Sequence, residues 1–83
     1  MSTKLFVGSL PWSIDDAKLK ETFETHGNVV SAKVVMDRAT GRSRGFGFVE
    51  MGSADEANKA IKALNDSELG GRNIVVNEAK SRN

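Results

Sequence analysis

Apolar residues recur along this 83-residue chain with two different periods, and these periods predict six secondary-structure elements. A period of two is typical of half-buried strands, and it predicts strands over 4–8, 29–36, 44–51 and 73–77. A period near 3.6 predicts two helices, over about 15–26 and 53–64. The elements are therefore expected in the order strand, helix, strand, strand, helix, strand.

The first predicted helix has both a start signal and a stop signal. Asp15 is a candidate N-cap, and Ser13 followed three residues later by Asp16 is an alternative capping box. Gly27 is expected to end the helix in a left-handed conformation. The apolar stripe of this helix consists of Leu19, Phe23 and His26. His26 is therefore interpreted as a partly buried packing residue, not as a catalytic one.

The second predicted helix begins with a clearer signal. Ser53 and Glu56 have the spacing of a capping box. The buried stripe that follows consists of Ala57, Ala60, Ile61 and Leu64. After this helix, Gly70-Gly71 is expected to form the turn of the connection that leads into the last strand.

This order of elements predicts an α+β fold, the ferredoxin-like βαββαβ sandwich. Two helices with one apolar stripe each can cover only one face of a four-stranded antiparallel sheet. Right-handed crossovers give the strand order 4-1-3-2, so the first and third strands are central and adjacent. An extra residue between Val29 and Ala32 requires a bulge in the second strand.

Each predicted strand has one face without charge and one face that mixes charge with large apolar side chains. The charge-free face, which the helices are expected to cover, consists of Leu5, Val7, Val34, Met36, Val49, Met51, Ile74 and Val76. The other face consists of Lys4, Phe6, Lys33, Val35, Arg44, Phe46, Phe48, Glu50, Val75 and Asn77. An exposed patch with three phenylalanines usually marks a binding surface. The alternative is that these rings are misassigned core residues.

Composition excludes several classes of site. The chain has no cysteine and a single histidine, so disulfides and a structural zinc site are not expected. The net charge is only +1, but basic residues gather between Lys33 and Arg44, which indicates one basic side. No apolar run has membrane length, and the N-terminus lacks a signal-peptide core. We therefore expect a cytoplasmic protein, or a nuclear one if its source is eukaryotic.

Trp12 lies in the loop after the first strand and has two interpretations. It could form a lid over the phenylalanine-bearing face, or it could plug the edge of the core. The plug is favoured, because a lone large aromatic residue is usually mostly buried.

The stretch from Arg44 to Met51, Arg-Gly-Phe-Gly-Phe-Val-Glu-Met, resembles the octapeptide signature of the RNA recognition motif at seven of its eight positions. Met51 is the departure, since that family has Phe or Tyr there. Leu5-Phe-Val-Gly-Ser-Leu10 is similar to the shorter hexapeptide signature of the family, with Ser9 where Asn or Gly is usual. The resemblance covers nearly the whole chain and implies one RNA-binding domain over residues 1–83, with a core at about 4–79 and a frayed polar tail at 80–83.

The resemblance also implies a role for individual residues. Phe6 and Phe48 would each stack on a base, Phe46 would pack against a ribose, and Arg44 would pair with a phosphate. Asn77 and the main chain near Ala79 would read base edges. Trp12 would flank the ligand from its loop. The complete expected RNA-binding set is Lys4, Phe6, Lys33, Val35, Arg38, Arg42, Arg44, Phe46, Phe48, Asn77 and Ala79.

We therefore predict a monomeric RNA-binding module without a cofactor, a metal or catalytic activity. It would hold about two to four unpaired nucleotides of RNA, or of single-stranded DNA, in post-transcriptional regulation or RNA chaperoning. The Gly-rich or Arg-rich tail common in the family is missing, so micromolar affinity is expected. A protein-interaction module, which would use the sheet or the helices, is the first alternative. A small hydrolase of the same fold class is the second, although the loop from Ser9 to Ser13 lacks an arginine to hold a phosphate.

Overall fold

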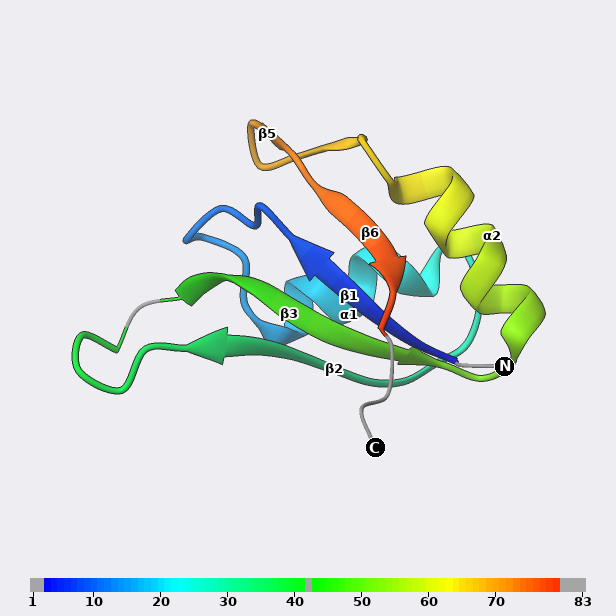
Figure 1. Cartoon of the computed structure of the whole chain (residues 1–83), viewed down its shortest axis with the longest axis horizontal. Coiled ribbons are helices and arrows are strands. Elements are labelled where there is room, and N and C mark those ends of the chain that lie inside the picture. The colour runs from blue at the N-terminus through cyan, green and yellow to red at the C-terminus, as the bar shows by residue number, and fades with distance from the viewer. Residues whose placement is uncertain (1–2, 42, 80–83) are drawn as a thin grey trace.

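The computed structural model describes residues 3–41 and 43–79 and confirms the predicted architecture. The main sheet has the order β2-β3-β1-β6, antiparallel throughout, which is the predicted order 4-1-3-2 read from the other edge (Figure 1). The expected frayed tail at 80–83 lies outside the described residues. The elements are β1 (Lys4–Gly8), α1 (Asp16–Glu24), β2 (Val29–Met36), β3 (Ser43–Met51), α2 (Ala54–Leu64), β4 (Glu68–Leu69), β5 (Arg72–Asn73) and β6 (Val75–Glu78).

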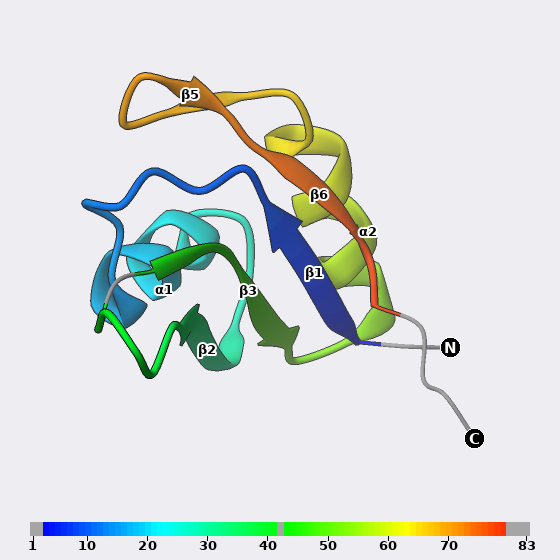
Figure 2. The same cartoon turned by 60° about the vertical axis from the view of Figure 1, so that its left-hand side comes forward.

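Both helices lie on the same side of the main sheet. Figure 2 shows α1 behind β3 and α2 behind β6, and the opposite side of the sheet is left without a helix. The core between the two layers consists of Leu5, Val7, Leu10, Ile14, Leu19, Phe23, Val34, Val49, Met51, Ala57, Ala60, Leu64, Ile74 and Val76. Seven of the eight side chains predicted for the helix-covered face are therefore buried, and Met36 is the exception.

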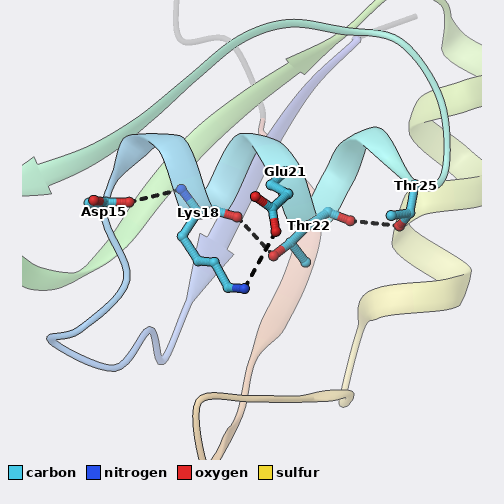
Figure 3. Close-up of polar contacts among 5 residues, drawn as sticks. All are labelled: Asp15, Lys18, Glu21, Thr22 and Thr25. Carbon is cyan, nitrogen blue, oxygen red and sulfur yellow. Dashed lines mark hydrogen bonds and ion pairs between the residues drawn. The ribbon is translucent and has the colours of Figure 1, made fainter.

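The outer face of α1 is polar and held by local contacts (Figure 3). The Asp15 carboxylate accepts a hydrogen bond from the Lys18 backbone N–H over 2.8 Å, so Asp15 is the N-cap and the alternative box from Ser13 is not formed. Lys18 also forms an exposed ion pair of 3.6 Å with Glu21. The hydroxyls of Thr22 and Thr25 donate to backbone carbonyls one turn earlier.

The end of α1 differs from the prediction. The helix ends at Glu24 with Thr25 as its C-cap, not at His26. The His26 backbone N–H donates to the Phe23 carbonyl three residues back, over 3.0 Å, which tightens and closes the last turn. Gly27 comes after this closure, with φ of 157°. A Cβ at Gly27 would lie 2.8 Å from a carboxylate oxygen of Glu56, so this glycine gives α2 room to approach.

The predicted capping box of α2 is present and also ties the helix to β2. The Ser53 hydroxyl accepts from the Glu56 backbone N–H over 3.2 Å and donates to the Glu56 carboxylate over 3.0 Å. The same carboxylate accepts a hydrogen bond from the Asn28 backbone N–H, just before β2. These two hydrogen bonds, first that of Asn28 and then that of Ser53, together with the charge of Lys59, lower the pKa of Glu56 below its ordinary value.

Strand β2 is irregular at two points, and only one of them was predicted. The register against β3 shifts between Val29 and Ser31, which confirms the bulge expected there. A second shift lies between Val34 and Met36. There two residues of β2 lie opposite four residues of β3, and Met36, at the end of β2, is 50% exposed. The prediction that Met36 belongs to the core is therefore wrong.

The segment between α2 and β6 contains a hairpin that was not predicted. Gly70 and Gly71, with φ of 61° and 90°, form the predicted turn, and this turn closes the small β4–β5 hairpin. Pro11 is buried next to Gly70, where a Cβ would lie 3.0 Å from the proline ring. Trp12 is 68% exposed, so the favoured plug interpretation of this residue is wrong.

Candidate nucleic-acid interface

Three phenylalanine rings form one cluster on the face of the sheet that no helix covers. Phe6 of β1 pairs directly with Phe48 of β3, and Phe46 lies opposite Gly8 on the same two strands. The ring centroids are 5.8 Å apart for Phe6 and Phe46, 5.9 Å for Phe6 and Phe48, and 6.2 Å for Phe46 and Phe48. Phe48 is 37% exposed and the other two rings are half-buried. The rings are therefore held by one another and still accessible to a flat ligand.

Two rings of the cluster, Phe6 and Phe48, belong to a row that crosses the four strands of the main sheet. Lys33 of β2 is the register partner of Phe48, and Asn77 of β6 is the register partner of Phe6. Lys33 and Asn77 are both exposed. The row thus runs from a cation, over two aromatic rings, to an amide. This sequence of groups suits a ligand with a charged backbone and flat polar rings.

Glycines permit two close approaches at this site. A Cβ at Gly8 would lie 3.0 Å and 3.3 Å from two carbons of the Phe6 ring, so the absence of a side chain lets that ring lie over β1. A Cβ at Gly47 would lie 2.5 Å from the Lys33 carbonyl and 3.3 Å from the Leu19 side chain. Gly47 therefore lets β3 lie close to both β2 and α1, below Phe46 and Phe48.

A hollow of about 620 Å³ opens on the same face beside Phe48. Five of the residues predicted to bind RNA line it, namely Lys4, Lys33, Val35, Arg38 and Phe48. Its other lining residues, which were not predicted to bind RNA, are Ser31, Val34, Met36 and Glu50. The position of Glu50 on the Phe48 face was a usable signal for one of them. Met36 could not be found in this way, because strand parity places it on the opposite face, with Val34.

The remaining predicted site residues lie in different places. Asn77 is exposed at the β6 edge, and the Ala79 backbone N–H donates to the Lys4 carbonyl over 2.9 Å, within the sheet. Arg42 lies outside the described residues, and Arg44 is placed only by its backbone, in β3. The structure thus brings the aromatic rings and Lys33 together on one surface. The expected phosphate contact of Arg44 stays a prediction.

The described residues were also compared with the requirements of a metal site and of a membrane-spanning helix. Over residues 3–41 and 43–79, no group of three or more His, Cys, Asp or Glu side chains is placed to hold a metal ion. Neither α1 nor α2, the helices in the described part of the chain, is long and apolar enough to cross a membrane. The chemistry that the open face offers is ring stacking, cation contacts and hydrogen bonding.

Comparison with known proteins identifies related chains. The family model described as the RNA recognition motif matches residues 5–75. The chain is 54% identical over 81 residues to the chloroplastic 28 kDa ribonucleoprotein of Spinacia oleracea, covering 98% of this chain. It is 55% identical over 82 residues to the mitochondrial glycine-rich RNA-binding protein 4 of Arabidopsis thaliana, covering 99% of this chain. The Sxl-lethal protein/RNA complex matches with a TM-score of 0.92 and 29% identity, covering 100% of this chain and 50% of that one.

The two named relatives differ from the expectation in their cellular location, and both are longer than this chain. Both named relatives are organellar, one chloroplastic and the other mitochondrial. The prediction of a cytoplasmic location is therefore wrong. The chain spans 35% of the length of the spinach protein and 60% of the length of the Arabidopsis protein.

Proposed function

Because this chain belongs to the RNA recognition motif family, whose members bind RNA, we propose that it holds about two to four unpaired nucleotides on the open face of its sheet. The binding unit is one domain formed by residues 4–79, and it acts as a monomer. Two bases stack on Phe6 and Phe48, and a ribose packs against Phe46. Lys33 and Arg44 hold phosphates, and Asn77 contacts a base edge.

The cluster of three accessible phenylalanine rings carries this proposal. A contiguous patch of large apolar side chains at the surface of a folded domain usually marks a binding site. The rings are spaced by 5.8 to 6.2 Å and are tilted or edge-on to one another, so each presents part of its surface outward. A stacked base contributes about 1–3 kcal/mol, so two stacked bases and a few phosphate contacts support micromolar binding.

The same surface favours single strands. Bases in a duplex are stacked on one another and cannot lie flat on Phe6 and Phe48. Stacking does not distinguish ribose from deoxyribose, so the preference for RNA over single-stranded DNA is expected to be small unless a side chain reads the 2′-hydroxyl. Binding also weakens as salt rises, because the cationic side chains displace counterions from the phosphates.

We propose that the module binds without catalysing a reaction. The described residues of the open face offer rings, charges and an amide, which suit binding, and the loop from Ser9 to Ser13 carries no arginine. RNA chaperoning and post-transcriptional regulation are both compatible with such a module. A protein partner on the helices is the second candidate function, but the outer face of α1 is occupied by local polar contacts, and over Asp16–Glu24 it carries no large exposed hydrophobic side chain.

The experiment is a fluorescence-anisotropy titration of labelled RNA pools of about eight nucleotides with the wild-type chain and Phe48→Ala, at low and at physiological salt. We expect micromolar binding by the wild type and a loss of about tenfold or more in the variant, because one stacking surface is removed. Val30→Ala is the matched control. It also removes exposed apolar surface from the sheet, since Val30 is 64% exposed, but Val30 does not line the hollow.

Circular dichroism spectra of all three proteins check that the fold is retained. Equal losses in Phe48→Ala and Val30→Ala would contradict a specific role for the rings. If the wild type binds none of the pools at low salt, the proposed function is wrong and the search turns to a protein partner.

A further inference from the structure

Glu50 is a carboxylate in a hollow otherwise rich in cations. It lies two residues after Phe48 on β3, and both side chains line the hollow of about 620 Å³. Lys4, Lys33 and Arg38 also line it. The three cations suit a phosphate-bearing ligand, whereas a carboxylate in the same place repels one. Glu50 therefore works against non-specific binding, and its position calls for another explanation.

The Glu50 side chain is poised to accept hydrogen bonds from a ligand. It is half-buried, and its carboxylate makes no hydrogen bond or ion pair with another residue that the structure describes. An ionised carboxylate is an acceptor only, with two oxygens side by side. Its ligand must therefore offer N–H or O–H donors, and two parallel donors would satisfy it best.

The hollow also has the walls that a base requires. Phe48 forms one side, and Met36, which is 50% exposed, adds an apolar surface together with Val35. Side chains two residues apart on a strand are separated by about 7 Å. A base lying beside Phe48 therefore directs one edge toward Glu50, whose register partners are Lys4 and Ser31.

Of the four RNA bases, guanine fits this acceptor best. Its Watson–Crick edge presents the N1–H and N2–H₂ donors side by side, which a carboxylate can accept in parallel. Adenine and cytosine each place an acceptor nitrogen beside their single amino group, and uracil flanks its one N–H with two carbonyls. Each of these three edges brings an acceptor against a carboxylate oxygen, which is repulsive.

We propose that Glu50 selects guanine in the hollow between β2 and β3, and that it is the specificity-determining residue of this surface. The inference rests on the proposed RNA binding and deepens it by naming the base. Glu50 also weakens the binding of strands without a guanine at this position. Its carboxylate repels phosphate, and it has no matching pair of donors when another base enters the hollow.

The test uses oligouridines of about eight nucleotides in which one central uridine is replaced by guanosine, inosine, adenosine or cytidine. Fluorescence anisotropy gives the affinity of each for the wild type, Glu50→Gln and Glu78→Gln. Glu78 is the matched control, because it is exposed on β6, does not line the hollow and loses the same charge. Both variants remove one negative charge and so reduce the repulsion of phosphate equally, which is why the readout is the ratio of affinities between bases and not the absolute affinity.

We expect the wild type to bind the guanosine strand about tenfold more tightly than the adenosine strand, with inosine in between because it lacks the N2 amino group. In Glu50→Gln the guanosine preference should disappear and adenosine should gain, since a glutamine amide pairs with the donor and acceptor of adenine. Glu78→Gln should keep the wild-type ratios.

A wild-type chain without a guanosine preference, or with a preference that Glu50→Gln leaves unchanged, would overturn the inference. In either case binding that still depends on Phe48 would leave the proposed function in place. Absence of binding to every strand would instead mean that the proposed function itself has failed.

Discussion

The two faces of the main sheet differ most clearly at two consecutive residues of β1. Leu5 points toward the helices and is fully buried in the core. Phe6 points the other way, lies in the cluster with Phe46 and Phe48, and remains partly accessible. Both are large apolar side chains on the same strand. The fold thus uses one for stability and, in our proposal, the other for binding.

This difference shows that hydrophobicity alone does not define the core of a small domain. What separates the two faces is the set of neighbours that each apolar residue has. The helix-covered face has no charged residue among those predicted for it, whereas the open face places Lys4, Lys33 and Glu50 beside its rings. A buried charge without a partner costs free energy, so the charged face has to remain accessible to water.

The largest effect on stability is expected for Leu5→Ala. The variant leaves a cavity between the sheet and the helices, because Leu5 has no exposed surface. We expect a loss of about 2–5 kcal/mol in the free energy of unfolding, measured by urea denaturation followed by circular dichroism. A loss no larger than that of Phe6→Ala would remove the distinction between the two faces.

Phe6→Ala is expected to affect chiefly RNA binding, whereas Leu5→Ala affects chiefly the stability of the fold. The variant should lose about 1–3 kcal/mol of RNA-binding free energy, because it removes a stacking surface. Its unfolding free energy should fall by less than that of Leu5→Ala, since only the mutual contacts of the half-buried rings are lost. Anisotropy titrations and urea denaturation of the same preparations measure the two quantities. Unchanged RNA binding in a folded Phe6→Ala would contradict the stacking role.

The smallest expected effect concerns Glu56, on the helix-covered side, and appears as a pH dependence of stability. Its folded-state pKa lies below the ordinary value of 4.5, chiefly because of the hydrogen bond from the Asn28 backbone N–H. The ionised form is therefore favoured by folding. This contribution is complete above about pH 4.5 and is lost as the pH falls through the lower folded-state pKa.

Glu56→Gln should reduce stability near neutral pH and flatten the acid limb of the stability curve, measured by urea denaturation between about pH 7 and pH 3. Glu68→Gln, at an exposed position in β4, is the control and should keep the wild-type curve. RNA affinity at neutral pH should be unchanged in both variants. Parallel curves for wild type and Glu56→Gln would show that this carboxylate does not link α2 to β2.

The fold was predictable from the sequence because its signals are local and agree with one another. Strand alternation, the Ser53–Glu56 capping box and the Gly70-Gly71 turn each operate over a few residues. The end of α1 was misplaced because its closing hydrogen bond, from His26 to Phe23, leaves no distinctive sequence signal. Trp12 was misplaced because the buried residue of this loop is Pro11, which lies next to Gly70, and no local sequence signal indicates that contact.

The candidate site was predictable in its centre and not at its edge. Phe6, Phe46 and Phe48 follow strand parity and the strand order, so sequence reasoning is sufficient to place them on one surface. The hollow beside them reaches Met36 at the second register shift between β2 and β3, where the pairing slips by two residues, and strand parity alone does not predict this slip. Met36 was therefore assigned to the core, and Glu50 was placed on the right face without a role.

The most direct test compares the four phenylalanines of the chain in one experiment. Carbon–proton NMR spectra of the aromatic rings would be recorded while single-stranded RNA is added to the wild-type protein. We predict that the signals of Phe6, Phe46 and Phe48 shift, whereas that of Phe23, a fully buried residue of α1, does not. If all four signals stay in place, or if Phe23 shifts while the other three do not, the open face is not where RNA binds.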